Sequence, residues 1–337
     1  MEQTLAKRPV SMKDVAEHLG VSKATVSRAL SGKSEISARM RQKINQTSEK
    51  LGYRLNPSIQ DLVFKSRNGI TRNIGYVLVE RDFSDPAYAS LIDGIAEGIK
   101  KVQYNLILVK LTGEERDIFD LPPMLRDGRL DGIMVTGNIN LSVMGALKKL
   151  NIEIVALGAY SPAVLKGVNN VLINLEKLAY ESVEIAMKNG CRSIALFEET
   201  PDKFYTLQIY NYIKAAAQEY GIEFKDENFY QGSGSYSGAT SVMKPVLKQK
   251  TLSFDCIICR DFRTAEEISA LIMGRCGLDS EPDMQIVVSR PYPHFNLSIP
   301  ALYLNGNYEN VAKVGIELLI DRLTNNSKAN NPVQIKV

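Results

Sequence analysis

Basic and hydroxyl side chains gather near the start of the chain, at Ser22, Lys23, Thr25, Ser27 and Arg28. Such groups donate hydrogen bonds to phosphate oxygens and to base edges, which is the chemistry of DNA recognition. An arginine such as Arg28 can chelate guanine, whereas hydroxyls such as those of Ser22 and Thr25 suit phosphate. The cluster therefore predicts contact with a DNA groove, provided that one helix presents it.

Three short helices are predicted around this cluster. Ser11 is a good N-cap with Asp14 three residues later, and apolar residues at helical spacing follow. Gly20 breaks this first helix, Ser22 caps the second, which carries the cluster, and a third helix starts at Ser37. The tight turn between the first two helices is typical of a helix-turn-helix unit, whose second helix enters the major groove.

Charge is distributed unevenly along the chain. Residues 1–72 contain 14 Lys and Arg against 6 Asp and Glu, whereas the remainder contains 27 against 32. A basic head on an acidic body indicates a polyanion partner for the head alone. Composition alone also allows a small helical bundle with a solvated basic face, and it is the spacing of the helices that favours DNA binding.

A further short helix is predicted directly after the head. Asn56 is an N-cap and Pro57 suits the first helical position, which together encode about two turns. A helix so short is marginal alone in water. It needs a partner, either its symmetry mate or DNA, as expected of a hinge that folds on binding.

Specific motifs extend over the first 62 residues. They are Met12-Lys13-Asp14-Val15-Ala16, Gly20-Val21-Ser22, Ala24-Thr25-Val26-Ser27-Arg28-Ala29-Leu30, Arg41, Leu51-Gly52-Tyr53 and Asn56. These motifs strongly resemble the lactose-repressor family of bacterial transcription regulators. The resemblance implies base-reading residues, residues that touch the DNA backbone, and a wedge that unstacks one central step in the minor groove. In that order, these are Lys23, Ala24 and Arg28; Tyr53 and Asn56; and Leu62.

The hinge departs from the family pattern. Leu55 stands where the family usually has Pro before Asn, Ser58-Ile59 replace an alanine-rich stretch, and Gln60-Asp61 replace the usual Arg. An acid in a segment that approaches DNA costs affinity, because phosphate contacts depend on positive charge.

Beyond residue 72 the sequence alternates between strand-like and helical stretches. The predicted strands are 74–79, 104–109, 132–135, 152–157, 193–197, 255–259, 285–288 and 301–304. The predicted helices are 86–102, 117–126, 141–150, 175–189, 205–220, 237–249, 263–275 and 308–324. Such alternation gives parallel sheets with helices on both faces. There is too much chain for one sheet, so two doubly wound α/β subdomains with a ligand cleft at the strand ends are predicted.

The family resemblance implies a body like that of a periplasmic sugar-binding protein. The predicted domains are a helix-turn-helix domain (1–55), a hinge helix and linker (56–72), and an effector-binding and dimerisation domain (73–337). Its first lobe is predicted at about 73–168 and 303–325, and its second at about 169–300 and 326–337.

The positions at which the family usually holds its effector are altered. By alignment, the arginine that grips sugar hydroxyls appears as Gln208, an Asn-Asp pair appears as Arg260-Asp261, and a turn that usually carries an acid contains Arg290. These exchanges make the cleft more positive. We therefore hypothesise an anionic effector, such as a sugar phosphate or sugar acid, which Arg binds bidentately.

An alternative for the same positions is that Arg260 pairs with Asp261 or Asp283 and that the pocket is degenerate. Asp85 and Tyr88, near the start of the first helix of the body, are further candidates for effector contact.

Several functional classes are disfavoured. The chain has only two histidines, His18 and His294, and lacks Walker, GxSxG, HExxH and GxGxxG motifs, so neither catalysis nor a cofactor is expected. Cys256 and Cys259 lie three apart on a predicted strand and should point to opposite faces, which argues against a metal pair. No apolar run approaches the ~20 residues that span a bilayer, and the N-terminus does not resemble a signal peptide. A cytosolic protein is expected.

The sequence thus predicts a homodimeric, sequence-specific regulator that binds double-stranded operator DNA and senses a small molecule, most often as a repressor in this family. A dimer is expected because one short helix contacts too few bases alone. One alternative is a regulator gated by a protein partner. Another is a sugar receptor, which would have no use for residues 10–62.

Overall fold

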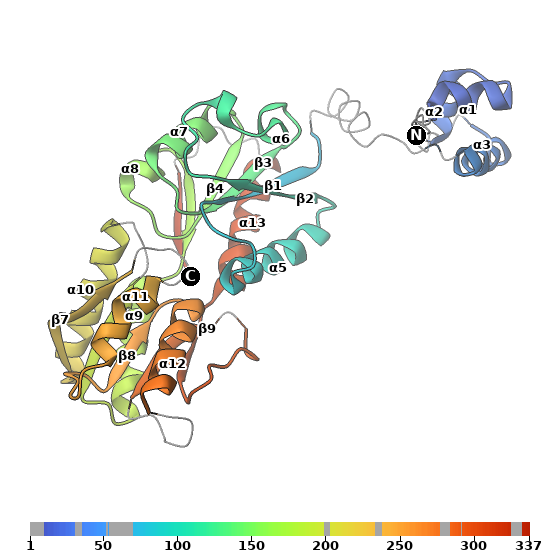
Figure 1. Cartoon of the computed structure of the whole chain (residues 1–337). Coiled ribbons are helices and arrows are strands. Elements are labelled where there is room, and N and C mark those ends of the chain that lie inside the picture. Colours follow the sequence, from blue (N-terminus) through green and yellow to red (C-terminus); the bar gives the residue numbers. More distant parts are fainter. Residues whose placement is uncertain are drawn as a thin grey trace, which may run out of the picture. The chain divides into compact units, whose positions relative to one another are not determined.

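The computed structural model describes residues 10–30, 36–51, 53, 70–198, 203–232, 238–276, 284–290, 292–324 and 332–337, without the side chains of Glu49, Lys203, Cys276 and Arg290. The chain divides into a head unit, Met1–Thr71, and a body unit, Arg72–Val337 (Figure 1). This division falls one residue before the predicted start of the body at residue 73. The predicted hinge helix, with Asn56 and Leu62, lies outside the described residues.

The head unit contains the helices α1 (Met12–Leu19), α2 (Lys23–Leu30) and α3 (Ala38–Leu51). Their apolar faces meet in one small core, whose buried members are Val15, Ala16, Val26, Ala29 and Ile44. The predicted three-helix arrangement is confirmed.

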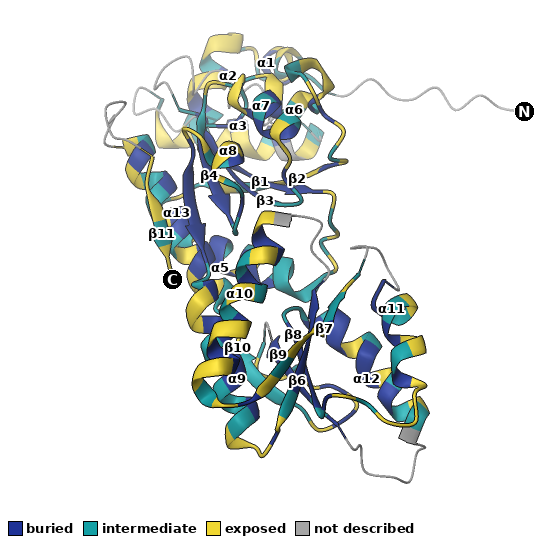
Figure 2. Cartoon of the chain, turned by 90° about the vertical axis from the view of Figure 1, so that its left-hand side faces the viewer, coloured by how far each residue is buried: buried dark blue, intermediate teal, exposed yellow. Residues whose placement is uncertain are grey.

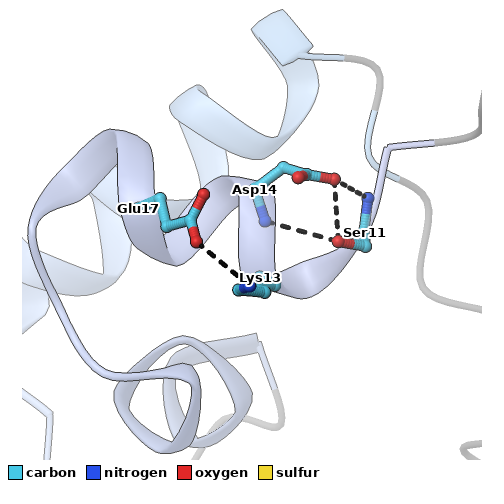
Figure 3. Close-up of polar contacts among 4 residues, drawn as sticks. All are labelled: Ser11, Lys13, Asp14 and Glu17. Carbon is cyan, nitrogen blue, oxygen red and sulfur yellow. Dashed lines mark hydrogen bonds and ion pairs between the residues drawn. The ribbon is translucent and has the colours of Figure 1, made fainter.

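Local hydrogen bonds explain where α1 begins and ends. The amide of Ser11 donates to Oδ2 of Asp14 over 2.6 Å, and the amide of Asp14 donates to Oγ of Ser11 over 3.4 Å, which forms a complete capping box (Figure 3). An exposed ion pair of 3.5 Å between Lys13 and Glu17 lies on the same helix. Gly20 ends the helix at φ +64°, a left-handed conformation that glycine adopts at little cost.

The first lobe of the body is a sheet in the order β11-β5-β4-β3-β1-β2. Its strands are β1 (Asn73–Val79), β2 (Asn105–Leu111), β3 (Gly132–Gly137), β4 (Glu153–Leu157), β5 (Asn169–Leu172) and β11 (Gln334–Lys336), and all neighbours are parallel. The helices α5 (Pro86–Lys100) and α13 (Tyr308–Thr324) pack on one face. The other face carries η1 (Ile118–Asp120), α6 (Pro123–Arg126), α7 (Leu141–Lys148) and α8 (Pro162–Leu165).

The second lobe is a parallel sheet in the order β10-β9-β8-β6-β7. Its strands are β6 (Ser193–Glu198), β7 (Glu223–Gln231), β8 (Cys256–Cys259), β9 (Gln285–Arg290) and β10 (Leu302–Asn305). The helices α9 (Leu175–Lys188) and α10 (Lys203–Tyr220) cover one face, and α11 (Gly238–Leu247) and α12 (Phe262–Cys276) cover the other. The central strands are buried between helices whose outer faces are exposed (Figure 2).

The two cysteines of β8 lie on opposite faces of this sheet, as predicted. Cys259 packs in the core beneath α11 and α12, whereas Cys256 packs in the core beneath α9 and α10. Both are buried free thiols. Within the described residues, no group of three or more His, Cys, Asp or Glu could hold a metal ion.

The predicted lobe boundaries require correction. β5 and β11 pair with each other in the first sheet, so residues 169–172 and 334–336 belong to the first lobe. β10 pairs with β9, so residues 302–305 belong to the second lobe. Strand pairing between segments this far apart in sequence decides these assignments, and composition does not encode it.

Other elements of the body also differ from the prediction. The predicted helix 117–126 is instead the short η1 followed by α6, because Pro122 and Pro123 cannot continue a helix that begins before them. The edge strand β7 was not predicted, since most of its residues are exposed and polar and it lacks the apolar run of a central strand.

Candidate functional site

The recognition surface of the head unit is the outer face of α2. Val26 and Ala29 point into the core, while four of the predicted DNA contacts, Lys23, Ala24, Ser27 and Arg28, are exposed. Helical periodicity produces this division, since the buried positions lie three apart. All four residues therefore lie on the outer face of α2.

The hydroxyls of Ser22 and Thr25 lie at the start of this helix. The amide of Thr25 donates to Oγ of Ser22 over 3.0 Å, and the two hydroxyl oxygens lie 2.8 Å apart. Their mutual bond uses one of the two hydroxyl protons, which leaves one to be donated to a phosphate oxygen. The positive end of the helix dipole favours an anion at the same place.

Tyr53 belongs to the core of the head unit as much as to its surface. It packs against the apolar cluster of the three helices, its amide donates to the carbonyl of Ser48 over 2.8 Å, and burial raises the pKa of its hydroxyl. The ring is thus held in a fixed position relative to α3. The remaining predicted DNA contacts, Asn56 and Leu62, lie outside the described residues.

A cavity of about 690 Å³, the effector cavity, lies in the body unit between the two sheets. Its walls come from the carboxyl ends of β1, β3, β4 and β8, from α5, α7 and α8, and from the starts of α9, α10, α12 and α13. Ligands of open parallel sheets bind at the carboxyl ends of the strands, because the chain connections that leave neighbouring strands diverge there. Four tyrosines line it together with six charged side chains: Tyr88, Tyr160, Tyr205, Tyr308, Glu80, Arg81, Asp85, Arg260, Asp261 and Arg263.

Four of the six predicted effector residues meet in this cavity, namely Asp85, Tyr88, Arg260 and Asp261. Gln208 does not line it. That residue faces a second cavity of about 360 Å³, and α10 presents Tyr205, one turn earlier, to the effector cavity instead. Arg290 ends β9, and its side chain is outside the described part of the chain.

Arg260 pairs with Glu198, which was not among the partners predicted for it. Nε of Arg260 lies 3.4 Å from Oε2 of Glu198, whose side chain is fully buried, and the guanidinium carbon lies 5.0 Å from the centroid of the Tyr205 ring. Asp261 is used differently, since its two carboxylate oxygens accept from the amide and the hydroxyl of Thr264 at 2.8 Å each. Asp283, the other predicted partner, is outside the described residues.

Asp85 combines a structural and a chemical position. Its Oδ1 accepts from the amide of Ala87 over 2.9 Å and so caps α5, while its carboxylate faces the effector cavity. Burial raises the pKa of Asp85, and the hydrogen bond from Ala87 opposes that rise. Burial likewise raises the pKa of the Tyr205 and Tyr308 hydroxyls, which therefore remain protonated and able to donate.

Sequence reasoning missed Glu198, Tyr205 and Tyr308. One signal was present, because an acid directly after an apolar strand marks the carboxyl edge of a parallel sheet, and Glu198 follows the run 193–197.

Two family models match the chain. Residues 11–56 match bacterial regulatory proteins of the lacI family, and residues 71–286 match the periplasmic binding proteins and sugar binding domain of the LacI family. Among the described residues, no helix is long and apolar enough to cross a membrane.

Individual relatives are similar over most of the chain. Catabolite control protein A of Priestia megaterium is 28% identical over 244 residues, which cover 71% of this chain and 70% of that protein. The HTH-type transcriptional regulator MalR of Streptococcus pneumoniae serotype 4 is 22% identical over 332 residues and covers 96% of both chains.

Solved structures share the fold. The lac repressor dimer bound to operator and the anti-inducer ONPF superposes with a TM-score of 0.74 at 16% identity, covering 98% of this chain and 97% of that one. The complex of the transcriptional regulator CelR with cellobiose gives 0.68 at 19% identity, with coverage of 98% and 97%.

Proposed function

This chain belongs to the lacI family of bacterial regulatory proteins and is a DNA-binding transcriptional regulator, not an enzyme, and we propose that it acts as a homodimeric repressor. A small molecule in the effector cavity would either release this repressor from operator DNA or hold it there. The observation that carries the proposal is the cavity itself, about 690 Å³ in volume and walled by both lobes. A ligand there contacts both lobes and can therefore bias their relative position.

The chemistry of the walls supports a sugar or a charged sugar derivative as effector. Carbohydrates are held by planar polar groups above an aromatic floor, and the cavity offers carboxylates and guanidinium groups beside four tyrosine rings. The structurally similar CelR is known as a complex with cellobiose. The proposed effector class comprises sugars, sugar phosphates and sugar acids.

On the DNA side, the proposal assigns base contacts to Lys23, Ala24 and Arg28. Ser22, Thr25 and Ser27 are assigned to phosphates or base edges. Tyr53 and Asn56 would touch the backbone, and Leu62 would enter the minor groove between two half-sites. The exposed outer face of α2 supports the first group.

The proposed mechanism is conformational. Effector binding changes the angle between the lobes, the first lobes of the dimer shift relative to each other, and the hinge segments lose their mutual contact. The two recognition helices then no longer fit both half-sites at once, so affinity for the operator falls. The coupling is reciprocal, so operator DNA lowers affinity for an effector that releases it.

The rival hypothesis, gating by a protein partner, requires a cavity filled by side chains. An open volume of about 690 Å³ argues against that filling. A sugar receptor without a regulatory role is inconsistent with the family to which the chain belongs.

The test combines DNA and ligand measurements. An operator is first selected from a random duplex pool by the wild-type protein, and its affinity is then measured with and without each member of a panel of sugars, sugar acids and sugar phosphates. We expect one member to raise the melting temperature and to change operator affinity. Specific DNA binding with no response to any panel member would favour the partner-gated rival.

A further inference from the structure

Glu198 and Arg260 are neighbours by strand register. β6 and β8 are parallel, with Phe197 opposite Cys259, so the next residue of each strand continues side by side on the same face. That face is the one covered by α10, since Leu196 and Ile258, two residues earlier on each strand, pack in the core beneath α9 and α10. The backbone thus directs both side chains toward Tyr205.

The guanidinium of Arg260 is held in one orientation. Glu198, only 1% exposed, lies against its Nε at 3.4 Å, and the Tyr205 ring lies 5.0 Å from its central carbon. The side chain of Arg260 keeps 26% exposure and lines the effector cavity. The ion pair with Glu198 and the Tyr205 ring together fix the guanidinium, so the direction of its terminal nitrogens is set before a ligand binds.

We infer that Glu198 is a positioning residue that sets the charge selectivity of the effector cavity: it aligns Arg260 and cancels its charge, so that the site prefers an uncharged polyhydroxylated ring over the corresponding acid. This inference rests on the proposed function and reverses the expectation of an anionic effector drawn from Arg260 alone.

The reason is competition inside a poorly solvated site. A carboxylate buried beside a guanidinium compensates most of its charge, and a ligand anion would have to compete with that carboxylate. A ligand hydroxyl can accept a hydrogen bond from the guanidinium and donate one to a carboxylate, so it meets no such repulsion. The other arginines of the cavity, Arg81 and Arg263, share its walls with three acids, Glu80, Asp85 and Asp261.

The test uses the full-length protein and matched ligand pairs that differ by one charge, glucose with glucuronate and galactose with galacturonate. Calorimetric titration gives the ratio of the two Kd values within each pair. Wild type should bind the neutral member more tightly. In Glu198→Gln, which keeps the shape but not the charge, the ratio should shift by about tenfold or more toward the acid.

The double variant Glu198→Gln with Arg260→Gln is the matched control, because it removes both charges of the pair. The double variant should not gain affinity for the acid. If Glu198 had only a structural role, Glu198→Gln would weaken the binding of both sugars of a pair equally. A second readout needs no sugar. At constant ionic strength, replacing chloride by sulfate should raise the melting temperature of Glu198→Gln more than that of wild type or the double variant.

A wild type that prefers the acidic members, or a Glu198→Gln variant with unchanged Kd ratio and unchanged sulfate response, would overturn the inference while leaving a sugar-controlled regulator intact. If wild type binds no sugar of either kind, the proposed effector class fails. The sulfate comparison then decides on its own whether Glu198 cancels the charge of Arg260.

Discussion

The hydroxyl of Tyr292 donates a hydrogen bond to Oδ2 of Asp93 over 2.6 Å and so joins the two lobes of the body unit. Tyr292 follows β9 of the second sheet, and Asp93 lies on α5, which packs on the first. The ring is fixed by Phe295, whose centroid lies 5.3 Å away, and by the stacked ring of His294 at 5.4 Å. A change in lobe angle must therefore strain or break this bond.

Replacing Tyr292 by Phe removes the bond but keeps the ring, and we expect a loss of about 1 kcal/mol in the free energy of unfolding at neutral pH. Burial, then the bond to Asp93, raises the pKa of Tyr292 to about 12. The unfolded chain therefore releases this proton first, and wild type loses stability from about pH 10 upward, a loss that Tyr292→Phe lacks.

Melting curves at pH 8 and pH 10.5 measure both effects. Asp93→Asn and the double variant complete a thermodynamic cycle for the pair. Strictly additive effects of the two substitutions would show that the bond contributes nothing.

The second prediction concerns Asp85, whose carboxylate caps α5 inside the effector cavity. Asp85→Asn keeps an oxygen for the amide of Ala87 but has no charge, so it should be more stable than wild type at neutral pH. Because burial raises the pKa of Asp85 in the fold, wild type loses stability as pH rises from the unfolded value through the folded one, and the variant does not. The difference in stability between Asp85→Asn and wild type should therefore vanish at low pH.

Asp85→Ala separates the cap from the charge. It removes the hydrogen bond to Ala87, which is 2.9 Å long, and should lose about 1 kcal/mol relative to Asp85→Asn. Melting temperatures of the three proteins between pH 4 and pH 8 make the comparison. Equal stability of the Asn and Ala variants would contradict the capping role.

The third prediction tests the packing of α5 against α13. A Cβ added at Gly94 would lie 2.7 Å from Cβ of Ala312 and 2.8 Å from the carbonyl oxygen of Glu309. Neither atom is the end of a flexible side chain, so Gly94→Ala should destabilise by about 1–3 kcal/mol despite its gain in helix propensity.

Gly145→Ala is the matched control, since Gly145 lies inside α7 and a Cβ there would meet no atom within 4 Å. It should stabilise by about 0.5–1 kcal/mol. Urea unfolding of both variants against wild type gives the comparison. A Gly94→Ala protein as stable as Gly145→Ala would mean that the two helices can move apart freely.

The head could be predicted from sequence because its signals are local. Ser11 and Asp14 lie three residues apart and cap α1, and Gly20 ends it, so each boundary is encoded within one helical turn. The position of Arg260 in the cavity was also predictable, because it directly follows a buried strand. Its partner was not, since Glu198 lies 62 residues away and only the pairing of β6 with β8 brings them together.

The placement of Gln208 failed for a related reason. Tyr205 and Gln208 lie three residues apart on nearly the same side of α10, so the alignment was displaced by about one turn along the helix, and Tyr205 rather than Gln208 reaches the effector cavity. The charge around Arg260 was incompletely predicted for the same reason as its partner, because Glu198 lies 62 residues away in sequence. The anionic effector inferred from the arginine positions therefore stays a prediction.

The last prediction concerns the exposed face of α2. Arg28→Ala should lower affinity for the selected operator by about 1–3 kcal/mol and relax specificity at one base position, because a guanidinium that chelates guanine carries sequence information. Lys188→Ala is a control that removes one cation from α9, where Lys188 pairs with Glu184 at 2.6 Å in the body unit. It should leave both operator affinity and its salt dependence unchanged. Gel shifts at several salt concentrations, with operators permuted at each position, distinguish the outcomes. A uniform loss over all sequences would make Arg28 a phosphate contact, and unchanged binding would remove α2 as the reading helix.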